Sequence, residues 1–145
     1  MLFRSFGSEE QALLGSREYV RNPLVPLEKS ILLNMDGVGI GHSISAGAGK
    51  DFPSIMKFVE EANTEFVHRS LSSSSFPNLG RPRLDAAIFL RAGVPSVSFS
   101  TYGSVNYYHV PQDNLDIIKP EIMEDLAKIL FVSVVRMANS TLPLR

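Results

Sequence analysis

The residue types that could do chemistry together in this chain are acids and a histidine, in three separate stretches. Glu9 and Glu10 are adjacent in a Gly-Ser-Glu-Glu turn. Asp36 follows a short apolar run, and His109 lies in a long polar loop. One carboxylate of an adjacent pair can bind a metal ion while the other acts as a general base on water. Carboxylates and imidazoles suit zinc, so these residues predict a metal site if the fold brings them together.

Each stretch also has an ordinary structural interpretation. Adjacent acids in the first turn of a helix are stabilised by the helix dipole. An Asp at a strand end, such as Asp36, often makes a turn by bonding its own backbone, and a single loop histidine is usually only polar. Asp113, four residues after His109, is a candidate to orient its imidazole. His42 and His68 have no such surroundings, and we interpret both as structural or exposed.

Apolar runs and amphipathic stretches alternate along the chain, which indicates an α/β domain. We predict strands at 2–6, 30–36, 42–46 and 94–100, and helices at 10–21, 52–66, 84–91 and 120–139. The expected architecture is a three-layer sandwich in which helices flank a largely parallel or mixed sheet. Ligand sites of such sheets form beyond the carboxyl ends of the strands. Each candidate stretch follows a predicted strand, so we expect all three at one edge of the sheet.

Local signals define several boundaries of these elements. Ser8 is the expected N-cap of the first helix, and Asp51 that of the second. Residues 70–80 (SLSSSSFPNLG) are the one low-complexity stretch, which we interpret as a mobile surface loop bordering a site. A second long loop, rich in Gly, Asn, Tyr and Pro, is predicted over 101–118.

The composition excludes several classes of protein. A formal net charge of -1 gives no electrostatic case for binding nucleic acid. The absence of cysteine rules out disulfides and thiolate zinc sites, and it leaves the compartment open. The apolar run at 129–135 is too short to span a bilayer, and the first ten residues do not resemble a signal peptide. We therefore expect one soluble domain over residues 1–145, with no membrane partner.

Two glycine-rich stretches are similar to nucleotide-binding motifs but lack defining residues. The 47–50 stretch (GAGK) has Ile44 in place of the first phosphate-loop glycine and Asp51 in place of Ser or Thr. The 37–42 stretch ends in His42, where a dinucleotide fingerprint has glycine. The sequence also contains no Gly-x-Ser-x-Gly elbow of a serine hydrolase.

Four ordered stretches resemble the family-28 metallopeptidases, which include bacterial leucyl-type aminopeptidases and, more distantly, glutaminyl cyclases. They are 3–16 (FRSFGSEEQALLGS), 33–39 (LNMDGVG), 84–96 (LDAAIFLRAGVPS) and 108–114 (YHVPQDN). The resemblance covers nearly the whole chain. It implies a zinc-exopeptidase fold, a peptide substrate and two zinc ions in a complete site.

The resemblance also implies a role for each candidate residue. Glu9 corresponds to the general base that takes a proton from the attacking water. Glu10 and His109 correspond to ligands of one zinc ion, and Asp36 to a ligand of the second. Paired metal ions of this kind act on both the water and the substrate carbonyl.

Two further acids have supporting roles by the same resemblance, and three positions depart from the family. Asp85 is expected to support the site, and Asp113 to orient the imidazole of the histidine ligand. Leu84 stands where Ser is usual, Ala86 where His is frequent, and Asn114 where Thr is usual.

The family takes two more ligands, a His and a metal-bridging Asp, from a stretch well before its Glu-Glu pair. Only eight residues precede Glu9, and none of them is His or Asp. We therefore expect the C-terminal part of a zinc-exopeptidase domain, with zinc bound weakly or not at all. Apolar faces that the N-terminal part would cover are expected to favour homo-oligomers.

Three functions are compatible with these features. The first is aminopeptidase-type hydrolysis, incomplete or inactive in this chain alone. The second is a non-catalytic relative that serves binding or assembly, and the third is a one-zinc acyltransferase of the glutaminyl cyclase kind. The walls of a substrate pocket would come from 70–80 and 101–108, so the preferred substrate residue does not follow from the sequence.

Overall fold

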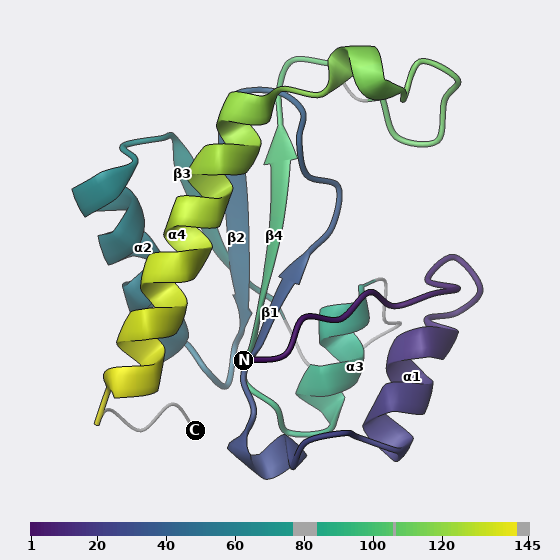
Figure 1. Cartoon of the computed structure of the whole chain (residues 1–145), viewed down its shortest axis with the longest axis vertical. Coiled ribbons are helices and arrows are strands. Elements are labelled where there is room, and N and C mark those ends of the chain that lie inside the picture. Colours follow the sequence, from purple (N-terminus) through teal and green to yellow (C-terminus); the bar gives the residue numbers. More distant parts are fainter. Residues whose placement is uncertain (77–83, 106, 142–145) are drawn as a thin grey trace.

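Four strands form a mixed sheet in the computed structural model, which describes residues 1–76, 84–105 and 107–141 (Figure 1). They are β1 (Leu32–Met35), β2 (Ser43–Gly49), β3 (Leu71–Phe76) and β4 (Ser96–Tyr102). The sheet order is β1-β4-β2-β3. β1 is parallel to β4, β4 is antiparallel to β2, and β2 is parallel to β3. A mixed sheet was among the expected arrangements, and the α/β class is confirmed.

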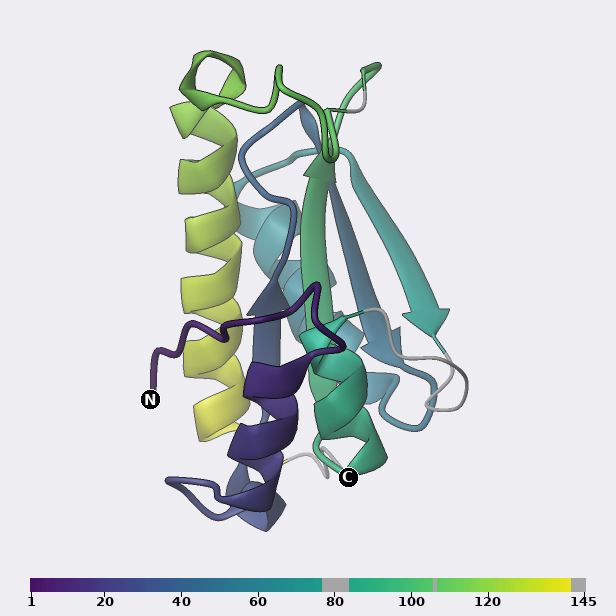
Figure 2. The same ribbon diagram turned by 90° about the vertical axis from the view of Figure 1, so that its right-hand side faces the viewer.

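Helices pack on both faces of this sheet (Figures 1 and 2). One face carries α2 (Ser54–Phe66) and α4 (Pro120–Asn139), and the other carries α1 (Leu14–Arg21) and α3 (Asp85–Arg91). Short 3-10 helices η1 (Leu27–Lys29) and η2 (Leu115–Ile117) lie in the connections. None of the described helices is long and apolar enough to cross a membrane.

The two faces have separate hydrophobic cores, because side chains of a strand alternate between faces. The core under α2 and α4 is the larger, and strand residues such as Ile44, Val97 and Phe99 are completely buried there. The smaller core joins α1 and α3 through aromatic rings. Tyr19 and Phe89 lie 5.7 Å apart between ring centroids in this smaller core.

The strand predicted at 2–6 is wrong. These residues form no ladder with any described strand. Phe6 instead packs on Tyr19 and Phe89 with centroids 5.8 and 5.6 Å apart, and the Arg4 guanidinium lies 5.5 Å from the Tyr19 ring. A short segment without a paired backbone has little reason to extend, and burial of the Phe6 ring decides the course of the chain here.

The start of the first helix also differs from the prediction. The helix begins at Leu14 rather than residue 10, and Ser8 is not its N-cap. Ser8 has a φ of 56°, and its carbonyl accepts the Leu14 N–H at 3.2 Å. The Gly15 N–H donates to the Gly7 carbonyl at 3.1 Å. The Glu9–Glu10 turn therefore folds back over the beginning of α1 instead of forming its first turn.

Two more predictions are corrected. Asp51 is not the N-cap of α2, because that helix is preceded by Pro53 and has no side-chain cap. The loop predicted at 70–80 is a strand over 71–76, paired along its length with β2. Serines are compatible with an extended strand when a neighbouring backbone supplies the hydrogen bonds. Positions 77–80 lie outside the described residues.

The remaining elements are confirmed, with boundaries moved by a few residues. The helix predicted at 120–139 has those bounds, and the helices at 52–66 and 84–91 start one or two residues later. The strands predicted at 30–36, 42–46 and 94–100 correspond to β1, β2 and β4.

Candidate metal centre

The parallel pairing of β1 and β4 places two candidate stretches at one edge of the sheet. Asp36 follows β1 directly, and its N–H donates to the Phe99 carbonyl of β4 at 3.0 Å. The Thr101 N–H donates to the Gly37 carbonyl at 3.1 Å, so the two chains stay together beyond the end of β1. β4 then leads into the loop that carries His109. The carboxyl ends of these strands thus supply Asp36 and His109 from the same edge.

The third stretch reaches this edge through Glu10. Its Oε1 lies 2.6 Å from Nε2 of His109, although both side chains are more than half exposed. The Tyr108 hydroxyl donates to the same oxygen at 3.4 Å, and the Tyr108 ring stacks on His109 with centroids 3.7 Å apart. His109 has a φ of 58°, a left-handed conformation that costs about 1–3 kcal/mol and often marks functional positions.

The charges at this edge influence one another. Burial raises the pKa of the Glu9 carboxyl above its ordinary value, and the negative charges of Glu10 and Asp36 raise it further. Asp85 adds to this increase, whereas His109 opposes it. Burial also raises the pKa of Asp36, followed by the charges of Asp85 and Glu10. Five of the six residues that the sequence singled out therefore lie within the range of one another's charges, and Glu10 and His109 are in direct contact.

Asp85 has an unusual environment within this group. It is the first residue of α3 and only 8% exposed, yet its Oδ1 is buried with no hydrogen-bond partner among the described residues. A buried acceptor without a partner costs about 1–3 kcal/mol, and such atoms often face an ion or a water molecule. A carboxylate oxygen in this position beside other carboxylates is what a cation site provides.

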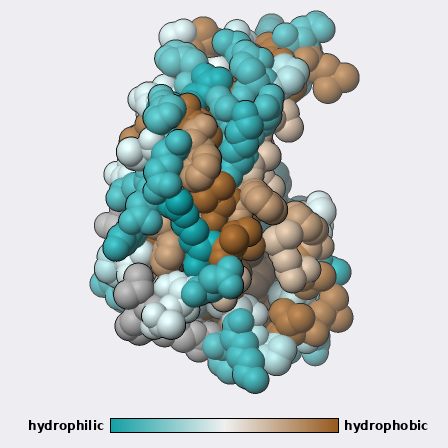
Figure 3. All heavy atoms as spheres, turned by 60° about the vertical axis from the view of Figure 1, so that its left-hand side comes forward, coloured by the Kyte–Doolittle hydropathy of each residue, from teal (hydrophilic) through white to brown (hydrophobic). Residues whose placement is uncertain are grey.

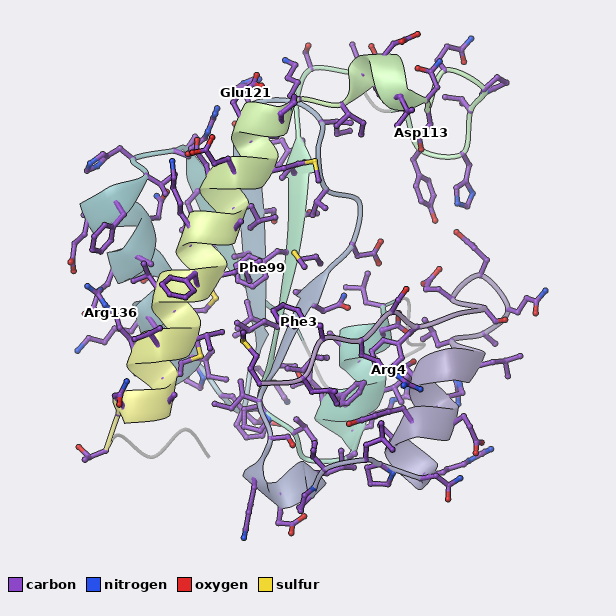
Figure 4. The ribbon with its side chains drawn as sticks, in the orientation of Figure 1. Phe3, Arg4, Phe99, Asp113, Glu121 and Arg136 are labelled. Carbon is purple, nitrogen blue, oxygen red and sulfur yellow. The ribbon has the colours of Figure 1, made fainter. Side chains whose placement is uncertain are left out.

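Asp113 does not join the group through any described hydrogen bond to His109. It lies in the loop before η2, beyond the end of β4 (Figure 4), where its N–H donates to the Val110 carbonyl at 3.0 Å. In this arrangement Glu10 holds the imidazole, and orientation of His109 by Asp113 stays a prediction. His42 and His68 are exposed, as expected.

Zinc is the cofactor that the donor types fit, but the donor number falls short. Carboxylate and imidazole are good zinc ligands, and catalytic sites normally use three protein ligands. Among residues 1–76, 84–105 and 107–141, no three ligand-type side chains converge on one point. Two donors of one tetrahedral zinc lie about 3.3 Å apart, so Glu10 and His109 need to separate only slightly from 2.6 Å.

Sequence reasoning missed Tyr108 as a member of this group. Its place beside a candidate histidine was visible, but adjacency along the chain does not predict ring stacking. The left-handed backbone at His109 turns the two neighbouring side chains to the same side. Burial raises the pKa of the Tyr108 hydroxyl, and the charge of Glu10, the hydrogen bond to Glu10 and the charges of Glu9 and Asp36 raise it further.

The comparisons with known proteins define the class of protein to which this chain belongs. The model of peptidase family M28 matches residues 1–134, and the chain belongs to this family. The comparison with curated proteins gives no match. The family is one of peptidases, which are hydrolases.

Among solved structures, the chain is similar to a zinc aminopeptidase from Bacillus subtilis, with a TM-score of 0.72 and 26% identity over 97% of this chain and 36% of that one. It is also similar to an aminopeptidase from Aneurinibacillus sp. strain AM-1, with a TM-score of 0.73 and 24% identity over 89% of this chain and 31% of that one. A glutaminyl cyclase from Porphyromonas gingivalis has a TM-score of 0.66 and 20% identity over 92% and 49%.

The last two likenesses concern the fold alone. The chain spans about a third of the length of the two aminopeptidases and about half of the cyclase. Activity, substrate and metal content of a whole protein therefore belong to the proposal that follows.

Proposed function

We propose that this chain carries part of the active site of a zinc-dependent exopeptidase that removes N-terminal residues from peptides. The observation that carries the proposal is the contact between Glu10 and His109, which are far apart in the sequence and meet at 2.6 Å. Asp36 is close enough for the charge of Glu10 to raise its pKa. Membership of a peptidase family supports hydrolysis. The Bacillus subtilis structure supports zinc, because it is described as a zinc aminopeptidase.

Each candidate residue has one task in this proposal. Glu10 and His109 hold one zinc ion, and Asp36 contributes to holding a second. When bound, zinc supplies Lewis-acid chemistry that lowers the pKa of water and polarises a carbonyl group. Asp85 supports the site, because its buried Oδ1 has no hydrogen-bond partner among the described residues and such an oxygen favours a nearby cation.

Glu9 is the general base of the reaction. Its carboxylate takes a proton as the oxygen of water attacks the carbonyl carbon of the substrate, and it returns a proton to the leaving amine as the C–N bond breaks. Burial and neighbouring carboxyls raise the pKa of Glu9. A base whose pKa moves toward the working pH accepts a proton more readily, which suits this task.

Hydrolysis of aminoacyl-anilides tests the proposal. The assay uses the longest reading frame that contains this chain, and it compares the parent with Glu9→Gln. We expect Glu9→Gln to bind zinc like the parent and to lower kcat by about 10²–10⁴-fold, since only the proton acceptor is lost. A parent that binds zinc without hydrolysing any aminoacyl-anilide would contradict the exopeptidase proposal.

A second candidate is a non-catalytic relative used for binding or assembly. It is favoured by the absence of a three-ligand group among the described residues and by the departures at Leu84, Ala86 and Asn114. Zinc measurements separate the two candidates. If the full reading frame binds no zinc and Glu9→Ala changes no measurable property, the non-catalytic candidate replaces the exopeptidase.

A further inference from the structure

The hydroxyl of Thr101 serves two backbone N–H groups of the turn that follows Asp36. Thr101 lies on β4 and is only 4% exposed. Its Oγ1 accepts hydrogen bonds from the N–H groups of Gly39 at 2.9 Å and Ile40 at 3.1 Å. Its own N–H donates to the Gly37 carbonyl at 3.1 Å. One side chain on β4 therefore fixes the path of the chain immediately after a candidate metal ligand.

This turn needs an acceptor from outside itself. Gly37, Gly39 and Gly41 have positive φ values of 62°, 107° and 72°, so the segment is neither strand nor helix. Its N–H groups consequently lack the partners that regular secondary structure supplies. Gly39 is buried, and a buried N–H without a partner costs about 1–3 kcal/mol. Thr101 removes this cost at Gly39 and also satisfies the half-buried N–H of Ile40.

The loop that carries His109 is anchored on the same turn at both of its ends. At its start, a Cβ on Gly103 would lie 2.9 Å from the Gly41 Cα, so the two backbones are in direct contact. At its end, the Lys119 N–H donates to the Gly39 carbonyl at 2.8 Å just before α4. Figure 1 shows both connections at the end of the sheet where β4 terminates. The Asp36 turn and the His109 loop therefore form one unit.

We propose that Thr101 is a positioning residue for both Asp36 and His109. Its hydroxyl fixes the turn after Asp36, and this turn fixes the two ends of the loop that carries His109. One hydrogen-bond acceptor therefore sets the distance between Asp36, which follows β1, and His109, which follows β4. The metal-related part of this proposal rests on the proposed function, in which both residues bind zinc. The claim that Thr101 fixes the positions of Asp36 and His109 applies to the metal-free chain as well.

The test compares Thr101→Val, which removes the acceptor at nearly constant shape, with Thr101→Ser, which retains it. Two readouts use the metal-free chain: hydrogen exchange of the Gly39 and Ile40 amides, and the NMR shifts of the His109 ring. We expect Thr101→Val to increase the hydrogen-exchange rates of the Gly39 and Ile40 amides at least tenfold and to shift the NMR signals of the His109 ring. Zinc affinity is expected to fall by about 10–100-fold, as when other supporting residues of metal sites are lost. Thr101→Ser should resemble the parent.

Ser133→Ala is the matched control for general loss of stability. Ser133 is also completely buried, and its hydroxyl donates to the Phe58 carbonyl between α4 and α2. This change should lower stability without affecting the two amides or the His109 ring. The proposal is overturned if Thr101→Val changes these signals no more than Ser133→Ala does. A parent that binds no zinc, with the amide and ring effects present, would contradict the proposed function and leave the positioning role established.

Discussion

At the scale of single residues, Asp85 has an unfavourable environment within the part of the metal-free chain that the structure describes. Its carboxylate is buried at the start of α3 with one unpaired oxygen, and it raises the pKa of both Glu9 and Asp36. Like charges in one site oppose folding, and a cation removes this opposition. The same residue should therefore destabilise the chain without zinc and assist the site with zinc.

Replacing Asp85 by Asn tests this double effect. In the presence of a chelator we expect Asp85→Asn to increase the free energy of unfolding by about 1 kcal/mol, because the repulsion of Glu9 and Asp36 by Asp85 is removed. The same change should weaken zinc binding. Urea unfolding with chelator and zinc titration provide the two measurements. Asp116→Asn, which changes an exposed acid of η2, is the control, and equal effects of both changes would count against a special role for Asp85.

At the scale of elements, the sequence predicts best the strands whose apolar residues are buried and whose backbones are paired in the sheet. The apolar runs that became β1 and β4 pair in parallel, and this pairing places Asp36 and the loop that carries His109 at one edge of the sheet. The serines of β3 and the segment at 2–6 were misjudged, because their conformation depends on which backbone or aromatic ring lies beside them. The acceptor role of Thr101 likewise depends on the fold and leaves no pattern in the sequence.

The glycine pair that holds the Glu9–Glu10 turn gives a sharp prediction. A Cβ on Gly15 would lie 2.5 Å from the Gly7 carbonyl oxygen, whereas a Cβ on Gly7 would meet nothing within 4 Å. We expect Gly15→Ala to cost about 1–3 kcal/mol of stability and to weaken the Glu10–His109 contact. Gly7→Ala should do neither. Thermal unfolding and NMR shifts of His109 measure the two effects, and similar results for both variants would refute the described packing.

The packing of α2 against α4 makes a pH-dependent prediction. Arg136 of α4 donates to both carboxylate oxygens of Glu65 on α2, at 3.0 and 2.7 Å (Figure 4 labels Arg136). This hydrogen bonding lowers the pKa of Glu65 below its ordinary value of 4.5. A group with a lowered folded pKa contributes stability above its unfolded pKa, and the contribution is lost as pH falls through the folded value.

We therefore expect Arg136→Gln to reduce stability more at neutral pH than at acidic pH below the folded pKa of Glu65. A smaller loss should persist at acidic pH, because Arg136 also lies 5.7 Å from the Phe66 ring centroid. Both effects are modest, since Glu65 is exposed. Urea unfolding across this pH range measures them. A loss that is the same at every pH would exclude the ion pair as its cause.

At the scale of the whole molecule, exposed apolar side chains gather on one face. Figure 3 shows hydrophobic residues gathered beside a hydrophilic stripe on the face that includes α4. On α4, Phe131 is 67% exposed, and Met123 and Val135 are exposed as well. β1 is an edge strand within the described part of the sheet. Such surfaces normally bind another polypeptide.

We expect the 145-residue chain to self-associate through this face. Sedimentation over a series of protein concentrations should show species larger than the monomer. The double change Phe131→Ser and Val135→Ser should shift the distribution toward the monomer, because it removes apolar area from α4. Leu115→Ser changes a still more exposed apolar side chain in η2 and should have no such effect. A chain that stays monomeric at every concentration would contradict this expectation.

The most direct test of the central claim is a zinc titration followed by NMR of the three histidine rings. Binding through Glu10 and His109 predicts that the His109 signals change selectively, while those of His42 and His68 stay nearly constant. Glu10→Gln should abolish the change, and Glu9→Gln should preserve it. NMR detects even weak binding, so two donors suffice for a measurable effect. Equal changes at all three histidines, or a His109 response that survives Glu10→Gln, would contradict the assignment of this edge as a metal centre.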